Sequence, residues 1–557
     1  MSPVEQNNAA PSVATTWLER LEAASVAGNV EAFVCLWVTD DLLCFSWDLR
    51  CLNGREKITS YLVEPSGENE TTRLSLACLY DFRVASASTL GPPLFSINPY
   101  NPAARGVQGN FEFVLASPPG KGRGFLRLIE ESPSEWKATT VLMCMDDITG
   151  HEESRTRPLG FYPDLSTWDE VLARRAAAIS HDPTVLIAGD GLTGLTLAAR
   201  LGRMGIGALV VEKDEHIGDV WRKRKTFPKF ISKNKLADFL EAYATGEDLV
   251  IWTSSKLLPT PKYDEVTKRW TVTIDRKGEE TIVRPKHIIL ATGIGKPHHR
   301  DASRFKGKRA VVIGAVRSVQ GLCVMGTVTR LRIICIDFVH NGAESVTMIQ
   351  RSATCVTAGS TTDKLVYSVT YNEKFDIEDA DFANQSMPLR FALKLAAAGG
   401  TARQKAIDKE LFEGLEKAGF RLTWQLEEGG PEVGVLGFVA ERLAGGSLMD
   451  WGCGQLIIDG KVKVNHGNVN GLDEQNALFL DGSSIPADPA IANVIDLFGP
   501  SIMSKIGHEV WGLDDEGEFR ACYRPSGQPG LWIAMGTFQH CRFLGKRLIQ
   551  SEELGLK

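Results

Sequence analysis

A cluster of three glycines between two short apolar runs constrains the fold of this chain more than any other feature. Residues 184–213 read TVLIAGDGLTGLTLAARLGRMGIGALVVEK: an apolar run, a G-x-G-x-x-G turn, a helical stretch and a second apolar run. Gly189 permits the tight turn, Gly191 lets backbone N–H groups approach a pyrophosphate, and Gly194 lets the helix pack on the strand. The segment therefore predicts a strand–turn–helix–strand unit of a parallel α/β sheet, with a dinucleotide bound at the turn.

The residues after the turn agree with this interpretation. Leu192 and Thr193 belong to the turn, and residues 195–204 continue with helical spacing. The N-terminus of this helix carries a partial positive charge that favours an anion. The second apolar run ends on Glu212, followed by Lys213, about 20 residues after the turn, where an acid can bind a ribose hydroxyl pair. A tight turn that binds no ligand is the alternative interpretation of the same pattern.

One residue inside the turn opposes a bound phosphate. Asp190 lies between the first two glycines, where a carboxylate repels a pyrophosphate unless its side chain points to solvent. Asp190 therefore counts against tight phosphate binding at this turn, but not against the fold.

Length, charge and cysteine content limit the classes of protein that the chain can belong to. At a prior of about 150 residues per domain, 557 residues predict three or four units. A net charge of −7 gives no basic surface for nucleic acid. The polar N-terminal stretch does not resemble a secretory signal, and no apolar run approaches the roughly 18 residues of a membrane span. Eleven cysteines without metal-ligand spacing indicate reduced thiols, no metal site and a cytoplasmic protein.

The pattern of elements changes near residue 150. Residues 15–32 have helical periodicity, GREKITSYL is typical of a second short helix, and the strand-like runs lie at 41–54, 74–86, 109–117, 124–131 and 136–146. This order predicts a compact α+β unit over residues 1–150. Residues 151–182 include a polar, proline-containing stretch and are expected to form a linker.

Further motifs follow Glu212, and together they carry a resemblance to a known family. They are GDVWR at 218–222, FPKFISKNKLADFLEAYA at 227–244 and HIILATG at 287–293. With the glycine turn, these segments resemble the class B flavin-dependent monooxygenases, which include flavin-containing, Baeyer–Villiger and N-hydroxylating enzymes. The resemblance implies that Trp221, Arg222, Thr292 and Gly293 contact FAD. For Trp221, a place in the core is the alternative.

A second glycine turn lies about 125 residues after the first, in RAVVIGAVRSVQG at 309–321. The resemblance implies an NADPH turn of the form G-x-G-x-S, with Gly314 and Ser318 in place and Val316 at the second glycine. The next strand ends at Arg351, and an arginine there can pair with the 2′-phosphate of NADPH. Because the Val316 side chain obstructs close approach to a phosphate, a retained fold with weakened NADPH binding is the alternative.

Parts of the chain depart from the family pattern. Residues 324–337 look like an insertion, and the family segments expected after WRKR, after ATG and within 481–499 are missing or altered. These departures fit either a divergent, impaired member or errors at exon boundaries, and both alternatives stay open.

The two ends of the chain carry resemblances of their own. DDLLCFSWDLRCLNGREKITSYL resembles the nuclear-transport-factor-2-like (SnoaL-like) domain that precedes the flavin domain in a group of fungal monooxygenase-like proteins. This implies domain pairing or a homodimer through residues 1–150. RPSGQPGLWIAMG resembles the end of the same fungal group, where a strand and loop return to the flavin, and this implies that Gly536 approaches FAD.

The expected fold is α/β, with two Rossmann-like domains, for FAD and NADPH, preceded by an α+β cone-shaped domain. The FAD-binding domain is expected to span residues 183–300 and 470–557, and the NADPH-binding domain residues 301–469.

The resemblance implies a monooxygenase of secondary metabolism, in which NADPH reduces FAD and a flavin hydroperoxide transfers one oxygen atom from O2 to a small organic substrate. No residue of the sequence is assigned as a catalytic acid or base. Two alternatives remain: an FAD-binding oxidoreductase or impaired member without NADPH turnover, and a non-enzymatic binding or scaffold protein led by the N-terminal domain.

Overall fold

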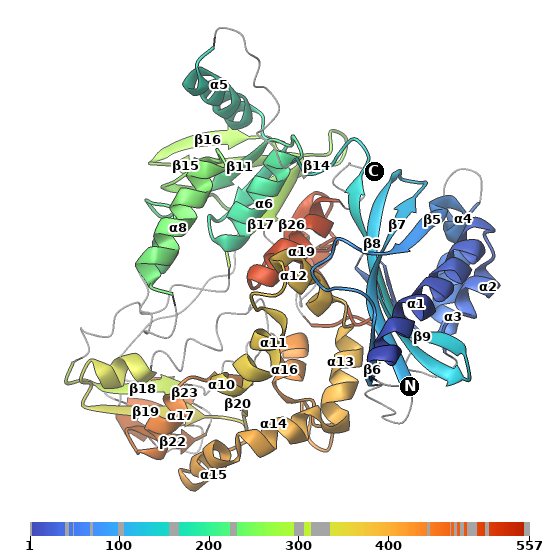
Figure 1. Cartoon of the computed structure of the whole chain (residues 1–557). Helices are drawn as coiled ribbons and strands as arrows, with labels where there is room; N and C mark the ends of the chain where they lie inside the picture. Colours follow the sequence, from blue (N-terminus) through green and yellow to red (C-terminus); the bar gives the residue numbers. More distant parts are fainter. Residues whose placement is uncertain are drawn as a thin grey trace.

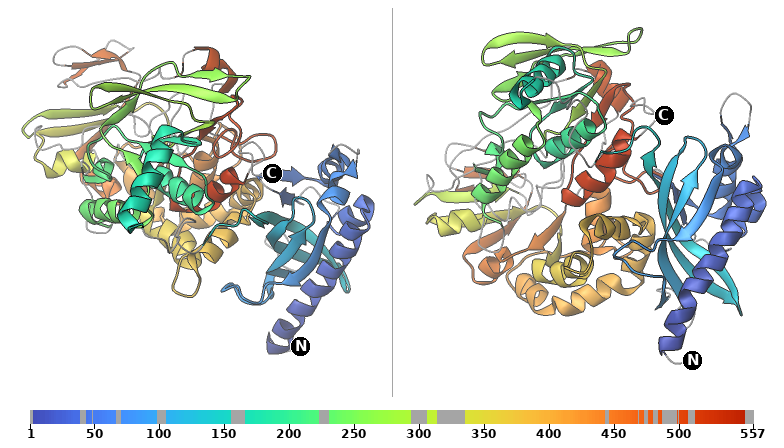
Figure 2. Two further views of the ribbon diagram at one scale, coloured as in Figure 1. Left: turned by 90° about the horizontal axis from the view of Figure 1, so that it is seen from above. Right: turned by 45° about the horizontal axis from the view of Figure 1, so that its top comes forward.

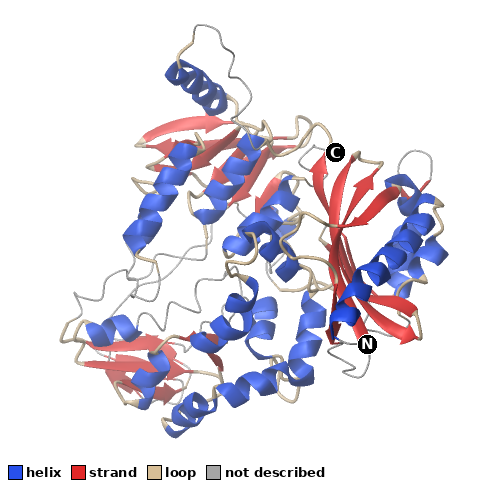
Figure 3. Ribbon diagram, in the orientation of Figure 1, coloured by secondary structure: helices blue, strands red, loops and turns tan. Residues whose placement is uncertain are grey.

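The computed structural model describes most of the chain (Figure 1). The described residues are 3–38, 44–47, 49–66, 71–97, 105–154, 166–222, 231–293, 306–313, 335–442, 446–467, 469–472, 476–479, 484–486, 498, 500–506 and 512–550. They form an N-terminal sheet with its own helices and two α/β units (Figures 1 and 3).

The N-terminal unit is a seven-stranded sheet with helices on one face (Figure 3). Its strands are β1 (Cys44–Trp47), β2 (Arg50–Asn53), β5 (Leu79–Val84), β6 (Leu94–Ile97), β7 (Arg105–Leu115), β8 (Gly120–Ser132) and β9 (Glu135–Ile148). Its helices are α1 (Pro3–Val26), α2 (Val30–Val34), α3 (Arg55–Val63) and α4 (Arg73–Ala77), and β3 (Pro65–Ser66) pairs with β4 (Thr71–Thr72). The strand order is β2-β1-β9-β8-β7-β5, with β6 also paired to β7.

Both faces of this sheet bury apolar side chains. Phe111 and Phe113 on β7 pack with Trp17 of α1 in the core of the N-terminal unit. Successive side chains of a strand point to opposite faces. Phe125 of β8 pairs with Asn110, the residue before Phe111 on β7, so Phe125 lies on the face opposite to Phe111. Phe125 belongs to the core of the first α/β unit. The second face of the sheet is therefore covered by the rest of the chain.

The first α/β unit is built on a five-stranded parallel sheet. Its strands are β10 (Val185–Ala188), β11 (Ala208–Val211), β12 (Val250–Trp252), β17 (His287–Leu290) and β26 (Leu531–Ile533). They lie in the order β12-β11-β10-β17-β26, so that a strand from near the C-terminus completes the sheet. Its helices are α5 (Trp168–His181), α6 (Leu192–Arg203), α7 (Asp219–Arg222), α8 (Lys233–Gly246) and α19 (Phe538–Ile549).

A small antiparallel sheet is inserted between β12 and β17. Its strands are β13 (Ser255–Leu257), β14 (Lys262–Asp264), β15 (Arg269–Arg276) and β16 (Glu279–Val283).

The second α/β unit contains a parallel sheet of three strands in the order β18-β19-β22. They are β18 (Arg309–Ile313), β19 (Ser345–Gln350) and β22 (Val462–His466). Other strands of this region are β20 (Cys355–Ala358), β21 (Ser447–Asp450), β23 (Val469–Leu472), β24 (Asn476–Phe479) and β25 (Ser484–Pro486). The helices are α10 (Gly359–Thr362), α11 (Ser368–Thr370), α12 (Ile377–Gln385), α13 (Leu389–Leu395), α14 (Thr401–Ile407), α15 (Lys409–Lys417), α16 (Gly434–Arg442), α17 (Cys453–Ile458) and α18 (Pro500–Ile506), with π-helical turns η2 (Asp363–Tyr367) and η3 (Ala396–Gly400).

Helices α12 and α19 lie between the N-terminal sheet and the α/β units (Figures 1 and 2). Arg127 of the sheet donates to the carbonyl oxygen of Ser386, just after α12, at 2.8 Å. Lys546 of α19 pairs with Asp146 of β9 at 3.2 Å. The N-terminal unit is thus joined to the rest of the chain by polar contacts as well as by a shared core.

The predicted fold class, α/β with two parallel units preceded by an α+β unit, is confirmed. The domain boundaries stay predictions. One expected element is wrong: residues 74–77 form part of α4 rather than a strand, because the Thr72 side chain caps a helix by accepting from the Ser75 backbone N–H. Within residues 151–182, expected as a linker, a capping box between Thr167 and Glu170 begins α5.

Candidate functional site

The three glycines of the first turn lie in different environments. Gly189 has a φ of +109°, and a Cβ built on it would lie 2.6 Å from the carbonyl oxygen of Ala291. A Cβ on Gly194 would overlap the carbonyl oxygen of Gly189, because α6 packs directly on the turn. A Cβ on Gly191 has none of the described atoms within 4 Å. Packing of the protein therefore requires Gly189 and Gly194, whereas Gly191 leaves room for a ligand.

The turn leads into the N-terminus of α6. Leu192 and Thr193 are its first residues, and the N-cap, Gly191, has no side chain to cap the helix. The first N–H groups of a helix have no partner within it, so they are available to an anion. The turn follows the carboxyl end of β10, which is where open parallel sheets bind ligands.

Glu212 follows β11 and lies beside the turn. Its side chain is buried, with Oε2 accepting from the backbone N–H of Asp190 at 3.2 Å and Oε1 from that of Asp214 at 2.8 Å. Lys213 is half-exposed and its Nζ lies 3.3 Å from Glu212 Oε1. These contacts hold the Glu212 carboxylate at the position expected for a ribose-binding acid.

The Asp190 side chain does not point to solvent. Its side chain is only 2% exposed, and its Oδ2 has no hydrogen-bond partner among the described residues. Burial and then the charge of Glu212 raise the pKa of Asp190 to about 8. The raised pKa favours the neutral form of Asp190, and a neutral carboxyl group does not repel a pyrophosphate.

Trp221 and Arg222 lie on α7, and their contacts are with α8 and its surroundings. Trp221 packs against a small apolar cluster that contains Leu240 of α8. The Arg222 guanidinium donates to Asp238 at 3.1 Å and to Glu241 at 2.5 Å. These contacts tie α7 to α8, and the assignment of both residues to FAD stays a prediction.

Thr292 and Gly293 follow β17 next to the glycine turn. The Cα of Thr292 lies 3.2 Å from a Cβ built on Gly189. Thr292 and Gly293 are both exposed, and Gly293 has a φ of +68°. The structure thus brings the ATG loop and the first glycine together, as expected for parallel strands that end at one edge.

The packing of α19 on α6 was not predicted from the sequence. Cys541 Sγ of α19 lies 3.1 Å from Thr193 Oγ1 in the first turn of α6, and the Tyr523 hydroxyl lies 3.6 Å from the same sulfur. Burial raises the pKa of the Cys541 thiol, so it is a neutral packing group rather than a nucleophile. No local sequence pattern marks a contact across 348 residues. Gly536 lies just before α19 with a φ of +139°.

The second turn is described only in part. Gly314, Val316 and Ser318 lie outside the described residues. Arg351 is exposed and follows β19 directly, at the edge where β18 also ends, since Ile313 pairs with Ile349. The NADPH assignment of Gly314, Ser318 and Arg351 stays a prediction.

The first turn has the features that an adenosine diphosphate group requires. They are open space beside Gly191, the N-terminus of α6 and the buried Glu212 carboxylate after β11. The described residues contain no cluster of His, Cys, Asp or Glu suited to a metal ion. Among the helices of the described ranges, none is long and apolar enough to cross a membrane. The nine cysteines with described side chains are all free thiols.

Comparison with curated proteins finds distant relatives with oxidoreductase names. The chain is 24% identical to the probable indole-3-pyruvate monooxygenase YUCCA9 of Arabidopsis thaliana, in a match that covers 28% of this chain and 46% of that protein. It is 22% identical to indole-3-pyruvate monooxygenase YUCCA1 of Oryza sativa subsp. japonica, covering 24% and 43%. It is 28% identical to an uncharacterized CzcO-like oxidoreductase of Geobacillus kaustophilus, covering 19% and 36%. The chain thus spans less than half the length of these curated relatives.

No family model matches the chain. Among solved structures, the bacillithiol disulfide reductase of Staphylococcus aureus aligns with a TM-score of 0.38 at 13% identity, covering 68% of this chain and all of that one. A steroid monooxygenase bound to NADP aligns with a TM-score of 0.35 at 16% identity, covering 55% and 69%. The sequence relatives support an enzyme related to monooxygenases and other oxidoreductases.

Proposed function

We propose that the chain is an FAD- and NADPH-dependent monooxygenase that inserts one oxygen atom from O2 into a small organic substrate. The observation that carries the proposal is the first glycine turn. Packing of the protein requires Gly189 and Gly194, whereas the space beside Gly191 is open. The names of the curated relatives support the same reaction class.

In this proposal the residues of the chain bind and orient the cofactors. Backbone N–H groups of Leu192 and Thr193 bind the pyrophosphate, and Glu212 accepts hydrogen bonds from the adenosine ribose. Asp190 stays neutral beside Glu212, so the turn adds no second negative charge next to the phosphates. Arg351 pairs with the 2′-phosphate of NADPH. When bound, the flavin supplies the redox chemistry that these side chains lack.

An FAD-binding oxidoreductase without NADPH turnover is the second candidate. It is favoured by Val316, which stands where the second glycine of an NADPH turn is expected. We also propose that the chain is a monooxygenase of the fungal type that acts in secondary metabolism and is located in the cytoplasm. Its N-terminal domain is proposed to be SnoaL-like and to form a homodimer. Light scattering of the purified chain tests the homodimer.

A substitution at Gly191 tests the dinucleotide site. Gly191→Val adds a side chain on the open side of the turn, so we expect the apoprotein to keep its melting temperature and to lose FAD. Gly194→Ala is the matched control, because its Cβ overlaps the turn and lowers the melting temperature. FAD binding is measured by flavin absorbance after gel filtration. Full retention of FAD in Gly191→Val would contradict the proposed site.

The spectrum of the wild-type chain then separates the candidate functions. A yellow protein whose flavin band bleaches on anaerobic addition of NADPH supports the monooxygenase. A yellow protein that stays yellow supports the oxidoreductase without NADPH turnover. A protein that takes up no FAD overturns both and favours the scaffold protein.

A further inference from the structure

Helix α19 contacts the first turn of α6 and the N-terminal sheet through two different faces. Successive residues of an α-helix are rotated by about 100° around its axis, so residues four apart share a face. Cys541 and Gly545 therefore lie on one side of α19, and Lys546 and Gln550 lie on the opposite side. Figure 1 shows α19 between α6 and the N-terminal sheet.

The first face of α19 packs closely on α6 because its residues are small. Cys541 is fully buried, and its Sγ lies 3.1 Å from Thr193 Oγ1. A Cβ built on Gly545 would lie 3.2 Å from Leu197 Cδ2, which is closer than ordinary van der Waals contact. Thr193 and Leu197 are four residues apart and lie on one face of α6. The N-terminal half of α6 is therefore fixed against α19.

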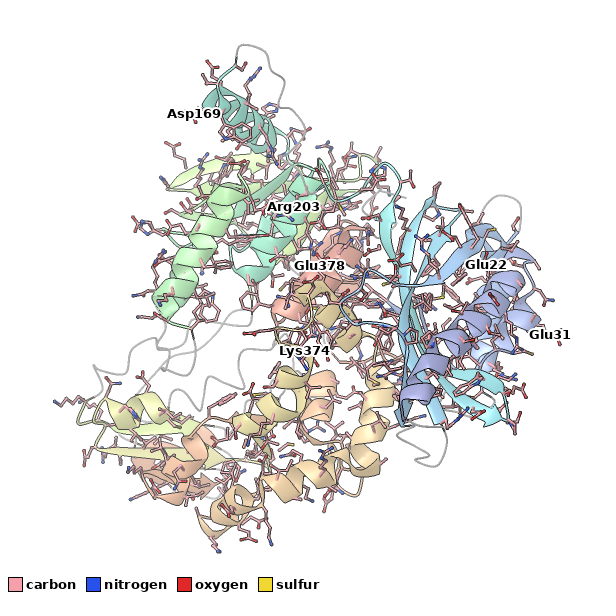
Figure 4. All side chains as sticks on the ribbon, in the orientation of Figure 1. Glu22, Glu31, Asp169, Arg203, Lys374 and Glu378 are labelled. Carbon is pink, nitrogen blue, oxygen red and sulfur yellow. The ribbon has the colours of Figure 1, made fainter. Side chains whose placement is uncertain are left out.

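The opposite end of α6 is held by another element. Arg203, the last residue of α6, is labelled in Figure 4. Its Nε donates to Glu247 Oε2, just after α8, at 3.0 Å. The contact of Cys541 with Thr193 thus acts at the end of α6 that lies next to Gly191.

The second face of α19 is bonded to strand β9 by polar contacts. Lys546 Nζ lies 3.2 Å from Asp146 Oδ1 and 3.7 Å from Asp147 Oδ1. Gln550 Nε2 donates to the carbonyl oxygen of Asp146 at 2.8 Å. The Lys546 side chain is only 15% exposed, so salt screens these pairs less than it screens pairs at the surface. The N-terminal sheet therefore fixes the side of α19 that faces away from α6.

We propose that α19 is a strut through which the N-terminal sheet positions the first turn of α6 for FAD, with Lys546 and Cys541 as positioning residues. This inference rests on the proposed function, because it concerns FAD bound at that turn. The sheet holds Lys546, and the helix extends from there to Cys541, about 7.5 Å along its axis. Cys541 in turn holds Thr193, whose backbone N–H binds the pyrophosphate in the proposed function. Rigid helices of this kind can carry energetic coupling between distant groups.

Titration of the full-length apoprotein with FAD tests the sheet end of the strut. We expect Lys546→Gln to raise the Kd for FAD about fivefold, because α19 loses its ion pairs with β9. Lys546→Arg keeps a cation at this position and is expected to retain the wild-type Kd. Lys409→Gln is the matched control, since it removes the same charge from an exposed lysine of α15. It is expected to bind FAD as the wild type does.

Substitutions at Cys541 test the end of the strut that contacts α6. Cys541→Ala removes the sulfur atom beside Thr193, and we expect the Kd for FAD to rise about threefold or more. Cys541→Ser keeps a hydrogen-bonding group there and is expected to bind FAD more tightly than Cys541→Ala does. Cys522→Ala is the matched control, because Cys522 is equally buried but its thiol donates to the carbonyl oxygen of Met535 rather than to α6.

Two further measurements separate positioning from stability. The melting temperature of each apoprotein is recorded, because a residue that only stabilises the fold lowers this temperature without changing the Kd of the folded protein. The visible circular dichroism of bound FAD reports the orientation of the flavin in its site. We expect it to change in Lys546→Gln and Cys541→Ala, and to stay as in the wild type in both controls.

The outcomes distinguish a failure of the strut from a failure of the proposed function. A wild-type chain that binds no FAD overturns the proposed function and the strut with it. Binding by the wild type with an unchanged Kd in both Lys546→Gln and Cys541→Ala overturns the strut alone. Equal weakening in Lys409→Gln also overturns the strut, in favour of general charge attraction. If Lys546→Gln fails to fold, the comparison of Cys541→Ala with Cys541→Ser decides.

Discussion

At the scale of single residues, the glycine turn contains a carboxyl group that is kept neutral. Asp190 and Glu212 lie side by side at the edge of the sheet, and both are buried. Two charged carboxylates in such a place repel each other, so one of them holds a proton. The pKa is raised for Asp190, inside the turn, where a negative charge opposes a phosphate most directly.

Asp190 makes the stability of the apoprotein depend on pH. The folded-state pKa is raised to about 8, so folding takes up a proton at every pH between the ordinary aspartate value and that point. The free energy of unfolding of the wild type therefore falls as pH rises through this interval and levels off above it. In Asp190→Asn the amide is neutral at every pH, so this fall is absent.

Urea unfolding of both proteins from about pH 5 to about pH 9 measures the effect as the difference between the two curves, which cancels other titrating groups. We expect the variant to gain stability relative to the wild type as pH rises. Two parallel curves would show that Asp190 is ionised in the folded state.

The sequence predicted the packing role of Gly189 and Gly194 in the turn, but not the protonation state of Asp190. Gly189 and Gly194 do what the spacing predicts, because close packing of a strand, a turn and a helix follows from local geometry. The state of Asp190 depends on a side chain 22 residues away, and the direction of that side chain is not fixed by the motif. The contacts of Arg222 with Asp238 and Glu241 likewise depend on how α7 packs on α8.

At the scale of elements, α19 and α12 are joined by one buried ion pair. Arg542 of α19 donates to both carboxylate oxygens of Asp381 of α12, at 2.5 and 2.8 Å. The Asp381 side chain is 3% exposed and also accepts from the Tyr371 hydroxyl at 2.9 Å. This pair connects α12 with α19, the helix that packs on the first turn of α6.

Removing one partner of this pair leaves a buried charge. We expect Arg542→Ala to lower the free energy of unfolding by about 3 kcal/mol, because the Asp381 carboxylate stays buried without its cation. Lys409→Ala is a control on the exposed pair with Glu413, and a change of no more than about 0.5 kcal/mol is expected there. Chemical denaturation measures the free energy of unfolding of both variants. Equal changes would mean that the buried pair stabilises the fold no more than the exposed pair does.

Elements close in sequence were more predictable than contacts between distant ones. The strands at 109–117, 124–131 and 136–146 were found in the sequence because alternating and apolar runs carry their own signal. The placement of β26 beside β17 and of α19 against α6 depends on pairing over hundreds of residues. The resemblance of the C-terminal segment indicated a return to the flavin domain, but not the strand or helix it meets.

At the scale of the whole molecule, the N-terminal unit and the α/β units share buried surface. Phe125, Leu142 and Cys144 of the N-terminal sheet belong to the core of the first α/β unit. Phe382 of α12 lies edge-on to Phe125, with ring centroids 6.4 Å apart. The N-terminal unit is therefore part of the folded body rather than a separate attachment.

Removal of the N-terminal unit is expected to cause aggregation. A chain of residues 166–557 exposes the faces of α12 and α19 that the sheet covers, and exposed apolar patches promote association. Gel filtration with light scattering measures the state of this chain. The full chain with Arg50→Ala loses only the part-buried ion pair between Arg50 of β2 and Glu516, keeps the covering sheet, and is expected to stay dispersed as the control. A monodisperse, cooperatively unfolding truncated chain contradicts this prediction.

The contact between the first sheet and the last helix also sets an order of events during synthesis on the ribosome. Arg547 Nη2 of α19 lies 2.9 Å from Cys144 Sγ of β9, across 403 residues of chain. At about 5–20 residues per second, translation takes on the order of tens of seconds to cover this separation. During that time the nascent N-terminal sheet is complete but one apolar face has no partner. We therefore expect this face to be where chaperones bind the growing chain.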